Sequence, residues 1–261
     1  MPKLLARWAL YFNRLDQTRA IILLLVLHVC WWTLTQALAT ANLDRYGDML
    51  ENYAWGQVLE WGSFKHPPLF AWVTGLWFRL TPVSDFSYHC MAYLNVALGL
   101  AGVALLARAM RLSALALPTI VLLCLAFPYS TLAAKFNANA VLLSVWPWVA
   151  LAWWHSLHQI KRSSALLWSV SFGFLAALAM LGKYYSGVLL LTLFMVSWSL
   201  PAGRAWLLSW RSWLTLGVFL LCLTPHALWL QNHEFVSLRY VAEQGEGAVA
   251  WSQIGLSLIH I

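Results

Sequence analysis

Charged residues are scarce in this sequence. Asp, Glu, Lys and Arg together make up 10% of its 261 residues, whereas hydrophobic residues make up 62%. A soluble domain carries about 25% charged residues, so this chain has too few to cover its surface in water. The composition excludes an ordinary soluble protein and predicts a polytopic membrane protein.

Several chemical motifs are also missing. The chain has neither the G-x-G-x-x-G nor the G-x-x-x-x-G-K-[ST] phosphate-binding pattern, and no H-x-x-x-H pair with an accompanying Glu. Nothing therefore indicates nucleotide-driven transport or zinc-dependent hydrolysis. The cysteines lie singly in apolar runs, without metal or disulfide spacing, and we expect them to be buried as small hydrophobic side chains: Cys30, Cys90, Cys124 and Cys222.

Acidic residues are fewer than basic ones, 9 against 16, and the sequence pI is about 9.4. The basic residues stand singly or in pairs between apolar runs rather than in one patch. We therefore expect no nucleic-acid partner and interpret Lys and Arg as signals of membrane topology.

Long apolar runs dominate what is present. A helix needs about 20 residues to cross about 30 Å of hydrocarbon, and the runs of that length lie at approximately residues 21–40, 86–107, 112–134, 136–160, 163–182, 184–203 and 212–233. They predict an all-α fold, a polytopic transmembrane helix bundle. The first run has no small-residue cleavage site, so we interpret it as a retained span rather than a signal peptide.

The two ends of the chain depart from this pattern. Residues 1–20 mix four basic residues with Leu, Trp, Tyr and Phe, which predicts a cytoplasmic amphipathic segment on the membrane surface. An eighth apolar run begins near Gly247 and stops at Ile261, short of a full crossing. We therefore expect residues 21–261 to form a transmembrane domain that is incomplete at its C-terminus.

The short apolar segment Leu69 to Leu80 decides the topology. Its twelve residues span about 18 Å as a helix, too short to cross, so we expect an interfacial helix. Ten of the sixteen basic residues then face the cytoplasm, against eight if the segment crosses. The non-crossing topology places the N-terminus in the cytoplasm and residues 41–85 in an outer loop, on the same face as the turns around Asn137 and Lys183.

Two acidic residues stand out in this outer loop. The stretch "LDRYGDMLENYAWGQVLEWG" has no Pro and spaces its apolar residues like an interfacial helix. Asp48 and Glu51 are three residues apart and so share one helix face, where their carboxylates can hold a proton, a substrate hydroxyl or a metal ion. A solvated acidic face is the alternative interpretation.

The stretch "KHPPL" follows on the same loop. Its two prolines fix an extended turn, which can direct Lys65 and His66 back toward the acids. A simple boundary between loop and helix is the alternative.

Two further turns on the predicted outer face carry polar groups. "FNANAVLL" opens a span with Asn137 and Asn139, and "LGKYYSG" places Lys183 and Tyr184 between two spans. Lys183 is a candidate for binding a lipid phosphate. The alternative is a lysine that snorkels to the headgroups.

In order and spacing these motifs resemble glycosyltransferase family 39, whose members share the membrane C-type glycosyltransferase fold and include protein O-mannosyltransferases and the lipid A aminoarabinose transferase. The acidic loop is followed by "HPPL" and an aromatic-rich helix, then by "RAMRL", "FNANAVLLSVW" and "AMLGKYYSGVLLL", over residues 20 to 235. The resemblance implies transfer of a sugar from an undecaprenyl (polyprenyl) phosphate donor to a lipid, glycan or protein hydroxyl, on the periplasmic face of a bacterial inner membrane.

The resemblance also implies roles for individual residues. Asp48 matches the general base that takes the proton of the acceptor hydroxyl, with Glu51 as a second acid. Lys183, and secondarily Lys65 and His66, match groups that stabilise the leaving phosphate, with Tyr184, Asn137 and Asn139 beside them. Direct attack of this kind inverts the anomeric configuration.

The chain departs from the family pattern at two places. Many relatives have adjacent Asp and Glu, whereas Met49 follows Asp48 here, and others carry Asp where Asn137 or Asn139 stands. Fewer carboxylates leave the binding of a divalent cation open. If one binds, Asp48 and Glu51 are the residues we expect to hold it.

Two other functions fit part of the pattern. A flippase or transporter for lipid-linked sugars would bind the headgroup without chemistry, although transporters usually place polar groups near the middle of their spans. A non-catalytic subunit that binds the lipid carrier is the other alternative. Both remain secondary to a membrane glycosyltransferase.

Overall fold

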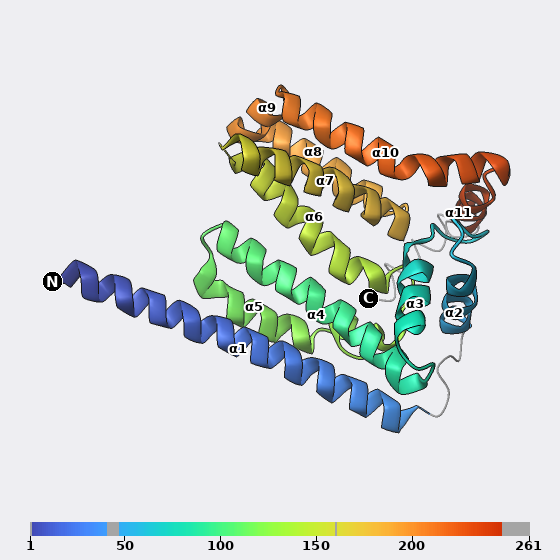
Figure 1. The fold of residues 1–261 in the computed structure, drawn as a ribbon, viewed down its shortest axis with the longest axis horizontal. Helices are drawn as coiled ribbons and strands as arrows, with labels where there is room; N and C mark the ends of the chain where they lie inside the picture. Colours follow the sequence, from blue (N-terminus) through green and yellow to red (C-terminus); the bar gives the residue numbers. More distant parts are fainter. Residues whose placement is uncertain (1, 41–46, 160, 247–261) are drawn as a thin grey trace, which may run out of the picture.

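The computed structural model of the protein describes residues 2–40, 47–159 and 161–246, and every regular element among them is a helix (Figure 1). The prediction of an all-α polytopic bundle is confirmed. The predicted eighth apolar run, from Gly247 onward, lies outside the described residues, as do residues 41–46 of the predicted outer loop.

Within the described ranges, five helices are long and apolar enough to cross a membrane. They are α1 (Pro2–Ala39, over Asp16–Ala39), α4 (Asp85–Ala109), α6 (Ala140–His158), α7 (Arg162–Gly182) and α10 (Trp210–Asn232). The segment predicted to lie on the membrane surface, residues 1–20, and the first predicted span share the single helix α1 from Pro2 onward.

The other two apolar runs form bent pairs rather than straight helices. The pair α5 (Ser113–Leu125) and η1 to η2 (Phe127–Tyr129 and Leu132–Ala134) bends by 79°, and the pair α8 (Ser186–Ser199) and α9 (Pro201–Leu207) bends by 110°. Leu200 at the second break is extended because Pro201 follows it. Counting each pair as one span gives seven, the number predicted.

The helices pack as two groups joined through α4 and α6 (Figure 1). On one side, α1 and α5 pack on α4 around Tyr93, Val96 and Ile120. On the other, α7 lies between α6 and α10. Small residues allow the close approach of α4 and α6, since a Cβ on Gly99 would lie 2.0 Å from the Leu143 carbonyl oxygen.

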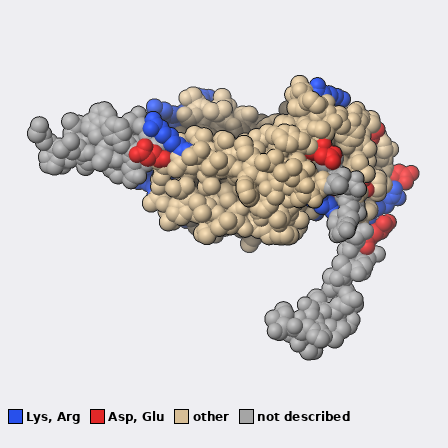
Figure 2. All heavy atoms as spheres, turned by 90° about the horizontal axis from the view of Figure 1, so that it is seen from below, with Lys and Arg blue, Asp and Glu red and all other residues tan. Residues whose placement is uncertain are grey.

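The molecular surface fits a bilayer. Figure 2 shows charged side chains toward the two ends of the face in view, separated by a broad uncharged belt. Large apolar side chains face outward along the spans, such as Leu122 (69% exposed), Trp213 (72%) and Leu221 (73%). An apolar surface of this extent marks contact with lipid.

The prediction that all four cysteines are buried is only partly correct. All four are free; Cys124 is buried, and Cys90 and Cys222 are half-buried. Cys30 is exposed, so the prediction is wrong there. Cys30 lies on α1, which packs on α4 and α5 and leaves its remaining surface outward.

The predicted outer loop folds as two short helices beside the ends of α4 and α6 (Figure 1). The helix α3 (Leu69–Leu80) has the predicted bounds, and α2 (Asp48–Val58) begins at Asp48, after Gly47 with a φ of 85°. Their close contact needs glycine, because a Cβ on Gly75 would lie 2.0 Å from the carbonyl oxygen of Gly56. The position of α3 at a membrane interface stays a prediction.

Gly75→Ala should separate α2 from α3 and lower stability. Relieving the clash requires a backbone shift, which costs about 1–3 kcal/mol and displaces the helix that carries Asp48. Gly217→Ala is the control, because a Cβ there meets nothing within 4 Å. Thermal unfolding in detergent tests this; equal melting temperatures for the two variants would show that the contact does not need glycine.

Candidate active site

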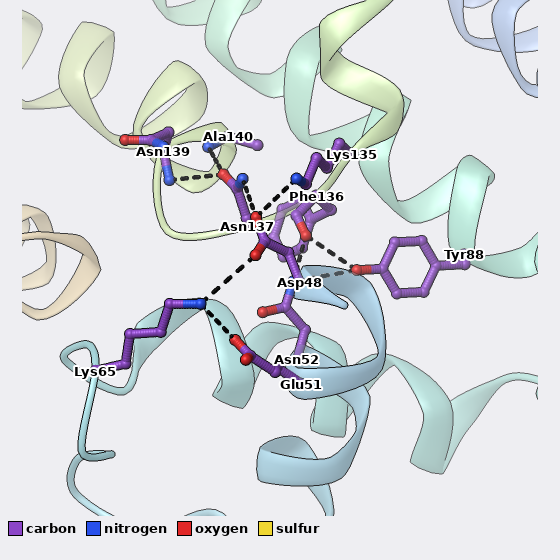
Figure 3. Close-up of polar contacts among 10 residues, drawn as sticks. All are labelled: Asp48, Glu51, Asn52, Lys65, Tyr88, Lys135, Phe136, Asn137, Asn139 and Ala140. Atoms are coloured by element: carbon purple, nitrogen blue, oxygen red, sulfur yellow. Dashed lines mark hydrogen bonds and ion pairs between the residues drawn. The ribbon is translucent and has the colours of Figure 1, made fainter. Parts of the chain in front are cut away.

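Polar side chains from three separated segments meet at the α2 end of the bundle (Figure 3). Asp48 and Glu51 stand in the first turn of α2, and Lys65 lies in the turn before α3. Lys135 and Asn137 lie between η2 and α6. An acid near a helix N-terminus is favoured by the helix dipole, which helps to explain why α2 begins with Asp48.

Asp48 is the centre of this cluster. Its Oδ2 lies 3.0 Å from Nζ of Lys135 and accepts a hydrogen bond from Nδ2 of Asn137 at 3.2 Å. Its Oδ1 lies 3.6 Å from Nζ of Lys65, which also donates to Oε2 of Glu51 at 2.9 Å. The prediction that Lys65 turns back toward both acids agrees with this geometry.

The electrostatic environment keeps Asp48 ionised. Burial raises the pKa of its carboxyl, but hydrogen bonds from Lys135 and Asn137 and the charges of Lys135 and Lys65 outweigh burial, so that the pKa lies below its ordinary 3.8. Burial lowers the pKa of Lys65, but the larger combined effect of Glu51 and Asp48 raises it above the ordinary 10.5. The cluster is therefore a set of ion pairs at pH 7.

A buried polar anchor holds α2 in place beneath these ion pairs. Asn52 donates from Nδ2 to the hydroxyl of Tyr88 at 3.1 Å and to the carbonyl of Phe136, and the Tyr88 hydroxyl donates to the same carbonyl at 3.0 Å. All three residues are at most 1% exposed. Their hydrogen bonds join α2, α4 and the segment before α6.

Asn137 and Asn139 link the cluster to α6 and to the turn between α7 and α8. The Oδ1 of Asn137 accepts from the backbone N–H groups of Asn139 and Ala140, at 2.9 and 3.1 Å, which leaves its amide N–H to face Asp48. The Oδ1 of Asn139 accepts from Nζ of Lys183 at 2.5 Å. The two asparagines thus position one acid and one lysine.

Lys183 and His66 extend the cluster. Burial lowers the pKa of Lys183, and Asp48 partly opposes this. Burial, with the charges of Lys183 and Lys65, lowers the pKa of His66 to about 4, against the opposing effect of Asp48. His66 is therefore neutral at pH 7 and can offer an anion a hydrogen bond but no charge.

Tyr184 lies in a second network beside the cluster. Its hydroxyl is 2.9 Å from Nε2 of His226 and 2.7 Å from Oγ of Ser237, on α11 (Val236–Glu246). Nδ1 of His226 is 2.5 Å from the carbonyl of Trp61, which can only accept, so Nε2 accepts from Tyr184. These bonds give Tyr184 a positioning role next to Lys183.

Two cavities flank the cluster. One, of about 130 Å³, is lined by Lys135, Asn137 and Asn139 together with Pro128, Leu132 and Leu143. The other, of about 200 Å³, lies beside the "KHPP" turn and is lined largely by aromatic side chains and prolines, among them Trp55, Phe64, Pro67 and Trp229. The polar cavity is thus lined by residues of the cluster, whereas the aromatic one adjoins the turn that carries Lys65.

The donor set does not fit a divalent cation. The described residues contain no group of three or more His, Cys, Asp and Glu side chains placed to hold a metal ion. Asp48 and Glu51 are instead bound by Lys65 and Lys135. Ammonium groups this close repel a cation, so an anionic ligand suits the cluster better.

Lys135 was missed by sequence reasoning. It makes the shortest ion pair of Asp48, yet it was not among the predicted site residues. A signal was present, because Lys135 directly precedes "FNAN" and is a lone cation between two apolar runs, as Lys183 is. Ion pairs and hydrogen bonds join six of the predicted residues: Asp48, Glu51, Lys65, Asn137, Asn139 and Lys183. The charges of the cluster alter the pKa of His66, and Tyr184 bonds elsewhere.

Comparison with known proteins identifies the family of the chain. A family model described as dolichyl-phosphate-mannose-protein mannosyltransferase matches residues 65–229, more than half of the 261-residue chain. The chain belongs to this family. The resemblance to glycosyltransferase family 39 is confirmed, and the protein is a membrane glycosyltransferase that uses a lipid-linked sugar donor.

The family match covers only part of the candidate site. No curated protein and no solved structure matches the chain. Within this mannosyltransferase family, the matched range includes Lys65, Lys135 and Lys183, but it begins after Asp48 and Glu51. The two acids are therefore assigned to the site by their ion pairs with matched residues.

The ion pair of Asp48 should make stability depend on pH. Because the folded pKa is lowered, the stabilisation is present above the ordinary value of 3.8 and is lost as the pH falls through the folded pKa. Lys135→Met should lower the melting temperature by a few degrees at pH 7 and by much less at about pH 3, with Lys135→Arg close to wild type. A deficit of equal size at both pH values would rule out the charge pair as its cause.

Tyr184→Phe should destabilise the fold without altering the charged cluster. It removes the partner of His226 and Ser237, which are 4% and 0% exposed, and a buried polar group left unsatisfied costs about 1–3 kcal/mol. Tyr185→Phe is the matched control, since Tyr185 is 61% exposed. Melting temperatures in detergent compare the two, and equal losses would exclude the network as the source.

Proposed function

We propose that the protein transfers a sugar from a polyprenyl-phosphate-sugar to an acceptor hydroxyl, with inversion at the anomeric carbon and Asp48 as general base. The observation that carries the proposal is the ionised Asp48 carboxylate, held between Lys65 and Lys135 with Lys183 nearby. A base and a set of cations are the two groups that this reaction needs.

The reaction proceeds by direct displacement. The acceptor oxygen attacks the anomeric carbon while its proton passes to Asp48, and the bond between that carbon and the phosphate oxygen breaks. The electron pair of the broken bond stays on the polyprenyl phosphate. The products are the glycosylated acceptor and the free carrier, and Asp48 returns its proton to solvent.

The lysines have two successive partners in this mechanism. Without donor, Lys65 and Lys135 bind Asp48 and Glu51, whereas Lys183 donates to the Oδ1 of Asn139. Three lysines against two carboxylates leave one positive charge. A bound phosphate attracts Lys65, Lys135 and Lys183, and hydrogen-bonds to the neutral His66. As the lysines turn toward phosphate, the pKa of Asp48 rises and the carboxylate becomes a stronger base.

The cellular setting of the proposal follows from topology. The positive-inside count supports a cytoplasmic N-terminus and an active site on the outer face of the membrane. The family resemblance suggests that this is the periplasmic face of a bacterial inner membrane, with undecaprenyl phosphate as the carrier. The acceptor is a lipid, a glycan or a protein. In this orientation the cytoplasmic side carries ten of the sixteen Lys and Arg residues, and the acids of the cluster lie on the opposite, outer face.

Asp48→Asn should abolish sugar transfer. The amide keeps the shape of the side chain but cannot accept a proton, and loss of a general base costs about 100- to 10,000-fold in rate. The assay uses the purified full chain in lipid vesicles, a polyprenyl-phosphate-linked radiolabelled sugar and extracted acceptors. Asp85→Asn is the control, because Asp85 is exposed at the start of α4 and outside the cluster.

Three outcomes of this assay separate the candidate functions. Normal turnover by the folded Asp48→Asn variant would remove Asp48 from the mechanism. Retention of the anomeric configuration in the product would exclude direct displacement. Unaltered donor recovered in the opposite leaflet, without transfer, would indicate a transporter.

A further inference from the structure

A second polar recess lies at the opposite end of the bundle from the candidate active site. It has a volume of about 520 Å³ and is lined by Gln17, Thr18, Arg108, Arg111, Ser113 and Ala114, from α1 and the turn between α4 and α5. Tyr88, which anchors the active-site end, precedes Arg108 by twenty residues of α4, about 30 Å along the helix. The recess is therefore separate from the catalytic cluster.

The two arginines are held in place by the fold. Arg108 is half-buried and donates from Nη2 to Oγ1 of Thr18 at 2.8 Å, across the contact of α1 with α4. Arg111 follows in a tight turn, where its N–H donates to the carbonyl of Arg108 at 3.0 Å. Its φ of 63° costs a residue other than glycine about 1 kcal/mol or more, and it keeps the exposed side chain beside Arg108.

The charge of this recess differs from that of the active site. Among the described residues, the lining of the recess includes two guanidinium groups and no carboxylate. Asp16 precedes Gln17 in the chain but is exposed and does not line the recess. The helix α5 begins there at Ser113 without a side-chain cap. Guanidinium groups bind phosphate oxygens in a bidentate manner, so the recess suits a phosphate group.

A comparable recess at the same end is already occupied by structural bonds. It is lined by Arg162 and Arg211, but Nη1 of Arg211 donates to the carbonyls of Ser156 and Gln159, at 3.2 and 3.0 Å. Arg211 thus caps the end of α6. The side-chain bond of Arg108 goes instead to the hydroxyl of Thr18, and no acid among the described residues forms an ion pair with it.

Apolar surface continues from the recess along both neighbouring helices. Ile22 and Val26 of α1 are 57% and 52% exposed, and Leu115 and Leu122 of α5 are 55% and 69% exposed. A lipid with its phosphate at the arginines can lay its acyl chains against these side chains. We propose that the recess between α1 and the α4–α5 turn binds the phosphate group of an anionic membrane lipid.

Lipid binding to the intact purified chain tests this site. The probes are dioctanoyl phosphatidylglycerol, dioctanoyl phosphatidylcholine and inorganic phosphate, each titrated in neutral detergent while the melting temperature is measured. Phosphatidylglycerol should raise the melting temperature more than the other two. Arg111→Gln should weaken its binding about tenfold or more, as expected for loss of a charge-assisted hydrogen bond.

The controls separate this site from general attraction to basic residues. Lys161→Gln removes one exposed charge from the start of α7, outside the recess, and should bind phosphatidylglycerol as the wild type does. Arg108→Lys keeps the charge but not the bidentate geometry and should give an intermediate affinity. Equal affinity of Arg111→Gln and Lys161→Gln would overturn the proposal, and so would an equal response to inorganic phosphate, which would indicate a site for the soluble anion.

Discussion

The position of one carboxylate constrains the whole polar end of this protein. Asp48 stands at the start of α2, 27% exposed, and a partly buried charge is costly without partners. Lys135 and Lys65 neutralise it from two sides, which ties α2 to the segment before α6 and to the turn before α3. The buried hydrogen bonds of Asn52 to Tyr88 and Phe136 hold the same helix from beneath.

The ion pairs that organise the site are also those that rearrange in the proposed mechanism. A fully buried pair would be too stable to exchange, and a fully exposed one would be weak. The side chains of Asp48, Glu51, Lys65 and Lys135 are between 20% and 35% exposed, so water and a phosphate can reach them. Intermediate burial therefore suits the proposed mechanism, in which the same lysines stabilise the empty site and bind the donor.

The sequence predicts local features of this fold better than long-range contacts. Apolar run length predicts the spans, and the "KHPP" turn followed by the twelve-residue segment from Leu69 to Leu80 predicts α3 with its observed bounds. The bends after Leu125 and Ser199 depend on packing and on prolines, and the length of an apolar run gives no information about either. Lys135 was missed because its role depends on Asp48, 87 residues earlier, and such a contact has no periodicity to reveal it.

The two ends of the bundle use cations for opposite purposes. At the candidate active-site end, Lys65 and Lys135 are paired with acids, so their charges are available only to a ligand that displaces the carboxylates. In the recess of Arg108 and Arg111, the lining residues include no acid, so the charge is available to any phosphate of suitable shape. Lysine suits the first task because its flexible ammonium can change partners, whereas the rigid guanidinium of arginine suits a standing contact with a headgroup. The two proposed sites therefore differ in whether acids pair with their cations, rather than in net charge. Paired lysines suit a site that releases its ligand after each reaction, and unpaired arginines suit one that keeps a lipid bound.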